Sequence, residues 1–285
     1  MFAYGAQCMK VKKVKKETVQ TESFDGTMLN CEKDLVGNPR AIVLIIHGVA
    51  EHLGRYDYVT DKFNSFGYSV YRYDQRGHGR SGGERGFFPR YDTLADDANV
   101  MVDLVRKEDA HLPVFVLGHS MGGMSAVGFS IKYPDKVRGI ILSGALCVDL
   151  NHMTDSIPAN LPPMTPLPNQ LSSLICSDHQ VVKAYEDDPL VLKEISVGLF
   201  RQIKACLEWF NSDRNLQKVH YPVLILHGGA DMIVLPQNAH HLYDNISSTD
   251  KEVKVYEGLY HEILNEKAKD EVIKDIHGWI EKRLD

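Results

Sequence analysis

A serine lies between two glycines in the segment 118–122, GHSMG, which has the pattern G-x-S-x-G. The apolar run Val114–Leu117 precedes it, and a helical pattern over 122–133 follows it. In that context the pattern predicts a nucleophile elbow, a sharp strand-to-helix turn that exposes the serine oxygen. Glycines flank the serine because so tight a turn leaves no room for Cβ atoms. The following helix offers its unpaired N–H groups to a developing oxyanion. Ser120 is therefore the candidate nucleophile.

A serine hydroxyl is a weak nucleophile unless a base removes its proton. The chain has 13 histidines, so the candidate base has to be identified by its position relative to Ser120 and the predicted strands. The order expected with this elbow is serine, then an acid, then histidine. Asp231 follows the apolar run 223–226, and His261 follows the run 253–256. Both are therefore expected on loops at the sheet edge that carries Ser120. There His261 would move the proton, and Asp231 would fix the imidazole tautomer.

Stabilisation of the oxyanion requires two backbone N–H donors. Met121 directly follows the nucleophile and supplies one donor through the geometry of the elbow. The other is expected from the loop after the apolar run 41–47, which reads His47-Gly48-Val49. Val49 N–H is the best candidate, and Gly48 would let the backbone approach the site closely.

Four histidines near these loops raise the question of a metal site. None of them shows H-E-x-x-H or a similar ligand spacing. We expect hydrogen-bonded structural histidines here, and neither a metal ion nor an organic cofactor. The four are His47, His52, His78 and His119.

Short apolar runs alternate with helical patterns along the chain. This alternation predicts an α/β fold, with a mostly parallel central sheet and helices on both faces. Apolar residues spaced as on one helix face predict helices over 93–107 and 272–280. The expected strands are 18–21 and 28–33, joined as a hairpin at Asp25-Gly26, then 41–47, 69–73, 114–117, 139–142, 223–226 and 253–256.

One segment, about 144–215, breaks the alternation. It holds six of the 12 prolines and two helical stretches, at 178–186 and 190–210. A structureless loop of this length is uncommon in a compact domain. We therefore interpret 1–285 as one domain with an inserted cap (lid) at about 144–215. The cap is expected over the carboxyl edge of the sheet, where such sheets bind ligands.

The formal net charge of −6 argues against nucleic acid as a partner, because phosphate binding requires clustered basic residues. One basic cluster is present near the N-terminus. We expect it to form the solvated face of an N-terminal strand, although such a cluster can also contact an anionic membrane surface. Its members are Lys10, Lys12, Lys13, Lys15 and Lys16.

The sequence favours a cytoplasmic protein. No apolar run approaches the ~20 residues that a membrane-spanning helix needs. Lysines follow the short stretch 1–9 instead of preceding it, which is not the order of a secretory signal. The five cysteines are odd in number and form no Cys-x-x-Cys pair, a pattern typical of free thiols in a reducing compartment.

Several segments together resemble the monoacylglycerol lipases and their lysophospholipase-like relatives among the α/β-hydrolases. The similarity spans roughly 20–283 and weakens through the cap. It implies the α/β-hydrolase fold with an inserted cap. By position, Ser120, Asp231 and His261 match the family's catalytic triad, and Val49 and Met121 match its oxyanion donors. The matching segments are HGVAEHLGRY at 47–56, DQRGHGRS at 74–81, GHSMGG at 118–123, PVLILHGGAD at 222–231 and YEGLYH at 256–261.

The sequence departs from the family at Ala50, where the family commonly has glycine. This difference changes the conformational freedom of the loop beside the expected oxyanion hole. We expect the alanine at this position to affect both the activity and the preference for the acyl chain.

The resemblance implies a serine carboxylic-ester hydrolase that releases a fatty acid from a monoacylglycerol, a small lipid ester, through an acyl-enzyme intermediate. A lysophospholipase and a general short-chain carboxylesterase are alternatives. A proline-aminopeptidase type of peptidase would need an acidic clamp for the substrate amine, for which Glu186-Asp187-Asp188 is a candidate. An alternative of another class is a non-catalytic ligand receptor on a hydrolase scaffold, against which the complete Ser, Asp and His set argues.

In this family the cap is typically apolar and lies on a membrane or micelle surface. Apolar residues of the cap would supply such a face here, or would instead pack the cap onto the domain. The sequence does not choose between these two roles. The residues are Leu161, Met164, Leu167, Leu171, Leu174 and Ile175.

Overall fold

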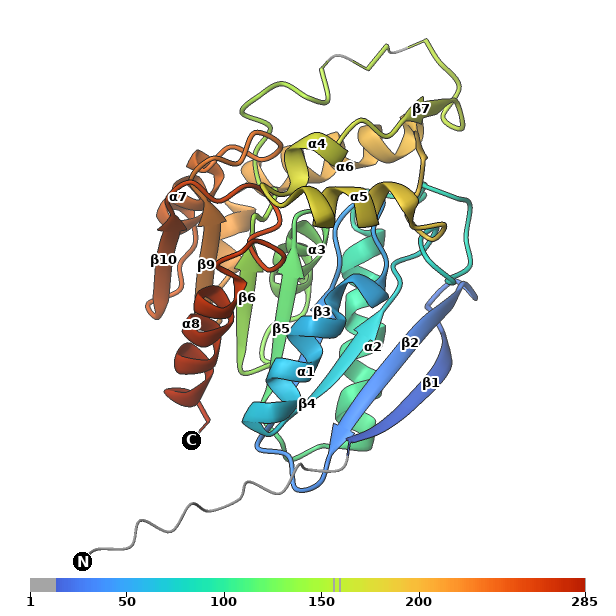
Figure 1. Cartoon of the computed structure of the whole chain (residues 1–285). Coiled ribbons are helices and arrows are strands. Elements are labelled where there is room, and N and C mark those ends of the chain that lie inside the picture. Colours follow the sequence, from blue (N-terminus) through green and yellow to red (C-terminus); the bar gives the residue numbers. More distant parts are fainter. Residues whose placement is uncertain (1–13, 156, 159, 285) are drawn as a thin grey trace, which may run out of the picture.

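An eight-stranded sheet forms the centre of the molecule (Figure 1). The computed structural model describes residues 14–155, 157–158 and 160–284. The strand order is β1-β2-β4-β3-β5-β6-β9-β10. β2 pairs antiparallel with β1 and β4, and all other neighbours are parallel. The strands are β1 (Val14–Glu22), β2 (Met28–Val36), β3 (Ala41–Ile46), β4 (Tyr68–Tyr73), β5 (Val114–His119), β6 (Gly139–Ser143), β9 (Val223–Gly228) and β10 (Lys251–Tyr256).

Helices cover both faces of this sheet (Figure 1). On one face lie α1 (Asp57–Phe66) and α8 (Lys269–Glu281). On the other lie α2 (Thr93–Glu108), α3 (Met121–Lys132) and α7 (Gln237–Asn245). The odd-numbered residues of β3 pack in the core with α1 and α8, and the even-numbered residues pack in the core with α2 and α3. Both faces of this strand are therefore buried, which explains its continuous apolar sequence.

The segment between β6 and β9 lies beyond the carboxyl ends of the central strands (Figure 1). It contains α4 (Ser172–Ile175), α5 (His179–Asp187) and α6 (Val197–Asn211). It also contains a two-stranded antiparallel sheet of β7 (Pro166–Pro168) and β8 (Glu194–Ser196). Backbone hydrogen bonds tie the segment to loops that follow strands of the large sheet, such as Leu192 N–H to Ala50 O at 2.9 Å and Glu262 N–H to Ile175 O at 2.7 Å.

The predicted strands of the large sheet and most of the predicted helices match observed elements, with several differences. The prediction of one helix over 190–210 is wrong at its start, because residues 194–196 pair with β7 as β8. α6 begins only after Ser196, whose side-chain oxygen accepts a hydrogen bond from Leu199 N–H and caps the helix. The sequence prediction also did not include α1, α4 or β7.

Part of the predicted basic cluster can be examined. Lys10, Lys12 and Lys13 lie outside the described residues. Lys15 and Lys16 are exposed on β1, and Lys16 forms an ion pair of 3.2 Å with Asp34. These two lysines are therefore solvent-exposed, on opposite faces of the strand.

Four cysteines lie within the described residues, and all four are buried and free. Among the helices that the structure describes, none combines the length and the apolar composition needed to cross a bilayer. The four are Cys31, Cys147, Cys176 and Cys206, while Cys8 lies outside the described residues.

The first turn of α3 passes so close to β3 that only glycine fits at Gly122. A Cβ atom there would lie 2.2 Å from Ile46 O and 2.5 Å from His47 O, both backbone atoms. We expect Gly122→Ala to lower the free energy of unfolding by about 3 kcal/mol, measured by urea denaturation. Gly278→Ala, in α8 with no atom within 4 Å of the added Cβ, is the matched control. It should raise stability by up to about 1 kcal/mol. Equal stability of the Gly122 variant and the wild type would contradict the close approach.

Candidate active site

Ser120 occupies a sharp turn between β5 and α3. Its backbone has φ 54° and ψ −118°, a conformation that costs free energy in a residue with a Cβ atom. The turn is held because Ser120 N–H donates to Ser143 O at 3.0 Å and Ser120 O accepts from Met124 N–H at 3.0 Å. Such strain persists only where the surrounding structure enforces it. The predicted strand-to-helix elbow is therefore present in the structure.

Asp231 and His261 form a direct hydrogen bond. His261 Nδ1 lies 2.7 Å from Asp231 Oδ2. Asp231 Oδ1 accepts two further bonds, from Ile233 N–H and Val234 N–H, both at 2.9 Å. Burial alone would raise the pKa of Asp231, but the neighbouring imidazoles of His261 and His227 favour the carboxylate and lower it. The charged carboxylate therefore holds the His261 proton on Nδ1 and leaves Nε2 free to accept one.

His261 reaches the same cavity as Ser120. The two line it together with Gly48, His119 and Glu262. Burial alone would lower the pKa of His261, but Asp231 and the nearby glutamates outweigh burial and raise it. The ring of His119 lies 4.7 Å from that of His261. Burial, reinforced by His261, lowers the pKa of His119 to about 4, so His119 is neutral at neutral pH.

The loop after β3 passes directly beside Ser120. A Cβ atom on Gly48 would lie 3.1 Å from Ser120 Cβ and 2.9 Å from Glu51 Oε2, closer than ordinary van der Waals contact, so the close approach favours glycine. Val49 and Met121, the predicted oxyanion donors, both line a cavity that also includes Ser120. The structure thus brings all five predicted site residues to one place.

Ala50 has φ 64°, in the left-handed region, and is completely buried. Glycine adopts this conformation freely, whereas a residue with a Cβ atom adopts it at a cost of about 1 kcal/mol. Although the sequence has alanine here in place of the family's glycine, the loop keeps the left-handed backbone conformation that glycine favours. Its carbonyl accepts the bond from Leu192 N–H, so the same residue joins the loop to the segment between β6 and β9.

His47 holds the backbone of the loop after β3 by hydrogen bonds from both of its ring nitrogens, one as acceptor and one as donor. Gln75 N–H lies 2.9 Å from His47 Nε2, so that nitrogen accepts and the proton sits on Nδ1. Nδ1 then donates to Gly48 O at 2.7 Å. The Gln75 side chain also donates to His47 O at 2.6 Å. His47 is thus a hydrogen-bonded structural histidine, as expected.

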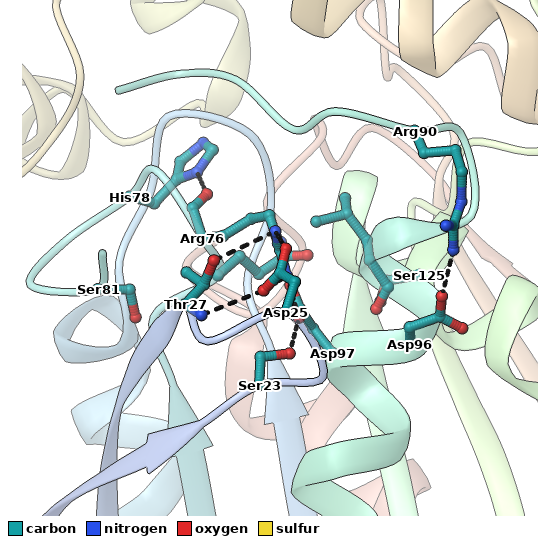
Figure 2. Close-up of polar contacts among 12 residues, drawn as sticks. Ser23, Asp25, Thr27, Arg76, His78, Ser81, Arg90, Asp96, Asp97 and Ser125 are labelled. Carbon is teal, nitrogen blue, oxygen red and sulfur yellow. Dashed lines mark hydrogen bonds and ion pairs between the residues drawn. The ribbon is translucent and has the colours of Figure 1, made fainter. Parts of the chain in front are cut away.

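Arg76 anchors the loop that carries Gln75 (Figure 2). Its guanidinium binds Asp97 of α2 through two hydrogen bonds, of 2.6 and 2.7 Å. It also binds Asp25 of the β1–β2 turn at 2.7 Å. Ser23 completes the group by donating to Asp97 at 2.5 Å. The segment 74–81, which resembles the family, is therefore held both by α2 and by the β1–β2 turn.

A buried charged cluster of Glu51, Arg55 and Glu262 lies next to His261, and the sequence prediction missed it. Arg55 Nε is 2.9 Å from Glu51 Oε1, and Arg55 Nη2 is 2.5 Å from Glu262 Oε2. Glu51 Oε2 accepts from Gly48 N–H at 2.7 Å, so the cluster also holds the loop beside Ser120. Glu51 and Arg55 stand in the matching segment 47–56, and Glu262 directly follows the segment 256–261, but nothing in their spacing indicated that they meet.

An apolar cavity of about 320 Å³ opens from Ser120. Most of its wall comes from the segment between β6 and β9. Two of the six apolar cap residues considered in the sequence, Leu167 and Leu171, line this cavity, and Ile175 is buried. Met164 and Leu174 are 45% and 37% exposed. The predicted apolar set therefore divides between an inner wall and an outer surface.

The acidic run Glu186-Asp187-Asp188 does not converge on Ser120. Asp188 binds His52 Nε2 at 2.9 Å, Asp187 binds Lys183 at 2.7 Å, and Glu186 accepts from Ser172. Each acid is thus paired with another side chain, and none of the three lines the cavities at Ser120. Separately, the described part of the chain contains no group of three or more His, Cys, Asp or Glu side chains arranged to hold a metal ion.

Comparisons with known proteins found relatives among the hydrolases. The model of a hydrolase family described as serine aminopeptidase, S33, matches residues 37–268. The monoacylglycerol lipase of Mycolicibacterium smegmatis is 32% identical over 254 residues, which cover 87% of this chain and 90% of that protein. Phospholipase YtpA of Bacillus subtilis is 31% identical over 255 residues, covering 86% and 97%. A soluble variant of the Saccharomyces cerevisiae monoglyceride lipase, solved with a substrate analog, has a TM-score of 0.82 and 27% identity and covers 98% of this chain and 99% of that one.

Proposed function

We propose that this chain, which belongs to the hydrolase family described as serine aminopeptidase, S33, hydrolyses monoacylglycerols through an acyl-enzyme formed on Ser120. It has the α/β-hydrolase fold and is a lipid ester hydrolase like its relatives. The observation that carries the proposal is the meeting of two features at Ser120. One is the buried pair of Asp231 and His261, and the other is the apolar cavity of about 320 Å³.

In the proposed acylation step, Ser120 Oγ attacks the ester carbonyl while His261 Nε2 accepts the hydroxyl proton. Asp231 stabilises the resulting imidazolium. The N–H groups of Val49 and Met121 stabilise the oxyanion. The carbon–oxygen bond to the alcohol then breaks, and His261 gives its proton to the departing alcohol oxygen.

In the deacylation step, water attacks the acyl-enzyme and His261 accepts one of its protons. Collapse of the second oxyanion breaks the bond to Ser120 Oγ, which takes the proton back from His261. The fatty acid leaves, and the site is restored with no cofactor consumed.

The apolar cavity supports an acyl chain as the acid part of the ester. Each buried CH₂ group contributes about 0.8 kcal/mol to binding, so a fatty acyl chain is favoured over a short acid. A second, small cavity at Ser120 includes polar side chains, those of His261, Glu51 and Glu262. A substrate with one apolar chain and a polar alcohol fits this division.

We propose that residues 144–215 act as a cap that shields this cavity and contacts lipid. Support comes from the position of α4, α5 and α6 beyond the carboxyl ends of the strands (Figure 1) and from the exposed apolar side chains of Met164 and Leu174. The proposed location is the cytoplasm, with peripheral contact to a membrane or micelle through these side chains. The buried free thiols support a reducing compartment.

A second candidate is a phospholipase that removes the single acyl chain of a lysophospholipid. The 31% identity to Phospholipase YtpA favours it, and the same triad would perform the chemistry. It differs from the first candidate only in the alcohol that leaves.

Hydrolysis of a substrate panel at equal concentration separates these functions. The panel contains monoacylglycerols of several chain lengths, a lysophosphatidylcholine, a triacylglycerol, a short p-nitrophenyl ester and a prolyl-arylamide. We expect the highest kcat/KM with a monoacylglycerol. Faster turnover of lysophosphatidylcholine would favour the phospholipase instead. Turnover of the short ester or the arylamide alone would contradict the lipid assignment.

A further inference from the structure

Next to His261, two buried carboxylates share a single buried guanidinium. Glu51 and Glu262 are each 3% exposed, and the side chain of Arg55 is 8% exposed. The two carboxylates share this one guanidinium, at 2.9 and 2.5 Å. Arg55 also stacks on the ring of Tyr185 at 4.8 Å, so its position is fixed. With both acids ionised, the cluster carries a formal charge of −1.

This charge lies where the leaving alcohol must depart. In the proposed reaction His261 gives its proton to that alcohol, so the alcohol has to be on the His261 side of Ser120. Glu262 directly follows His261 in the chain, and both line the small cavity that reaches Ser120. The cavity has a volume of about 10 Å³, room for about one water molecule, so the bulk of the alcohol has to lie at its mouth, near these charges. With so little water present, charges there are weakly screened and act strongly on a nearby group.

We propose that Glu262 selects for uncharged leaving alcohols and against alcohols that carry a phosphate. This inference rests on the proposed ester hydrolysis and names its alcohol. A phosphate would bring a second negative charge toward a cluster whose single cation is already held between two acids. A glycerol brings none and keeps its hydroxyl groups for hydrogen bonding. Glu262 is in this sense a specificity-determining residue of the site.

The groups that face Glu262 come from several elements. Arg55 of η1 (Leu53–Tyr56) and Glu51 lie on one side, Tyr185 of α5 on another, and Asn265 donates to Glu262 Oε2 at 2.8 Å. Burial and the neighbouring Glu51 raise the pKa of Glu262 despite Arg55. Glu262 therefore loses its charge more readily on acidification than an ordinary glutamate. The rejection of a phosphate should weaken as the pH falls.

The test compares two esters with the same octanoyl chain, both used as monomers below their micelle concentrations. One is octanoylglycerol, and the other is octanoyl lysophosphatidylglycerol, a phosphodiester that stays anionic throughout the working pH range. The readout is the ratio of their kcat/KM values. Effects of a substitution on the shared base His261 act on both substrates and cancel in this ratio.

We expect Glu262→Gln to raise the relative kcat/KM of the anionic ester by roughly tenfold, because it removes one nearby charge and preserves the side-chain shape. Glu257→Gln is the matched control, since Glu257 is exposed on the loop that also carries His261. It should leave the ratio unchanged. An unchanged ratio in a Glu262→Gln protein of normal melting temperature would overturn the inference while leaving the proposed hydrolysis intact.

Wild-type protein gives a second readout that needs no variant. Between about pH 9 and about pH 6 the relative kcat/KM of the anionic ester should rise as Glu262 takes up a proton. A ratio that stays flat over this range would overturn the inference even if Glu262→Gln fails to fold. Failure of the wild type to hydrolyse octanoylglycerol at any pH would instead reject the proposed function, and this inference with it.

Discussion

Ser120→Ala is expected to lower turnover by on the order of 10⁶ and to abolish labelling by a fluorophosphonate probe. The reason is that Ser120 Oγ forms the bond to the acyl group, and no water molecule held in its place reproduces that step. Removal of the hydroxyl should leave the fold intact, because the hydrogen bonds that hold the turn use the backbone of Ser120. The measurements are kcat with a monoacylglycerol, probe labelling and melting temperature.

Ser130→Ala provides the control for this substitution. Ser130 lies on the helix that follows the elbow, and its hydroxyl donates locally to Val127 O at 2.7 Å. Its loss should leave both labelling and turnover near the wild-type values. Labelling that persists in Ser120→Ala would show that another residue is the nucleophile. A wild-type protein that resists the probe and hydrolyses nothing would favour the non-catalytic receptor.

Asp231→Asn is expected to lower kcat by about 10⁴ at neutral pH. An amide at this position keeps an oxygen to accept the bonds from Ile233 and Val234 N–H, so the loop should stay in place. The amide is neutral, however, and no longer stabilises the His261 imidazolium. It can also present its NH₂ group to Nδ1, which would place the imidazole proton on Nε2 and face it toward Ser120.

The control for this prediction is Asp244→Asn, an exposed acid on α7. It changes the net charge equally and should leave kcat unaltered. A kcat for Asp231→Asn within tenfold of the wild type would remove Asp231 from the proposed mechanism. A large fall in melting temperature would show that the acid acts chiefly on stability.

The elements that could be predicted from the sequence are those whose signal lies in residues adjacent in the chain. β3 was recognised because a strand buried on both faces reads as an unbroken apolar run. The elbow was recognised because its glycines, strand and helix are adjacent in the chain. Asp231 and His261 could be chosen because each directly follows a strand whose carboxyl end faces the same edge.

Contacts between distant segments could not be predicted in this way. Arg55 and Glu262 are separated by 207 positions, and neither belongs to a periodic pattern. The start of α6 was missed for a related reason. Residues 194–196 become a strand only because the distant residues 166–168 pair with them. The strand propensity of residues 194–196 alone does not indicate that residues 166–168 will pair with them.

The order of strands in the sheet also determines when the site can exist. Gly48, Ser120, Asp231 and His261 follow β3, β5, β9 and β10, and β6 separates β5 from β9. A nascent chain on the ribosome therefore lacks the site until its last strand has emerged and paired. Because these pairings are distant in sequence, they form slowly compared with the helices. Recovery of catalysis during refolding should thus mark completion of the whole sheet, and fragments that lack β10 should have no hydrolase activity.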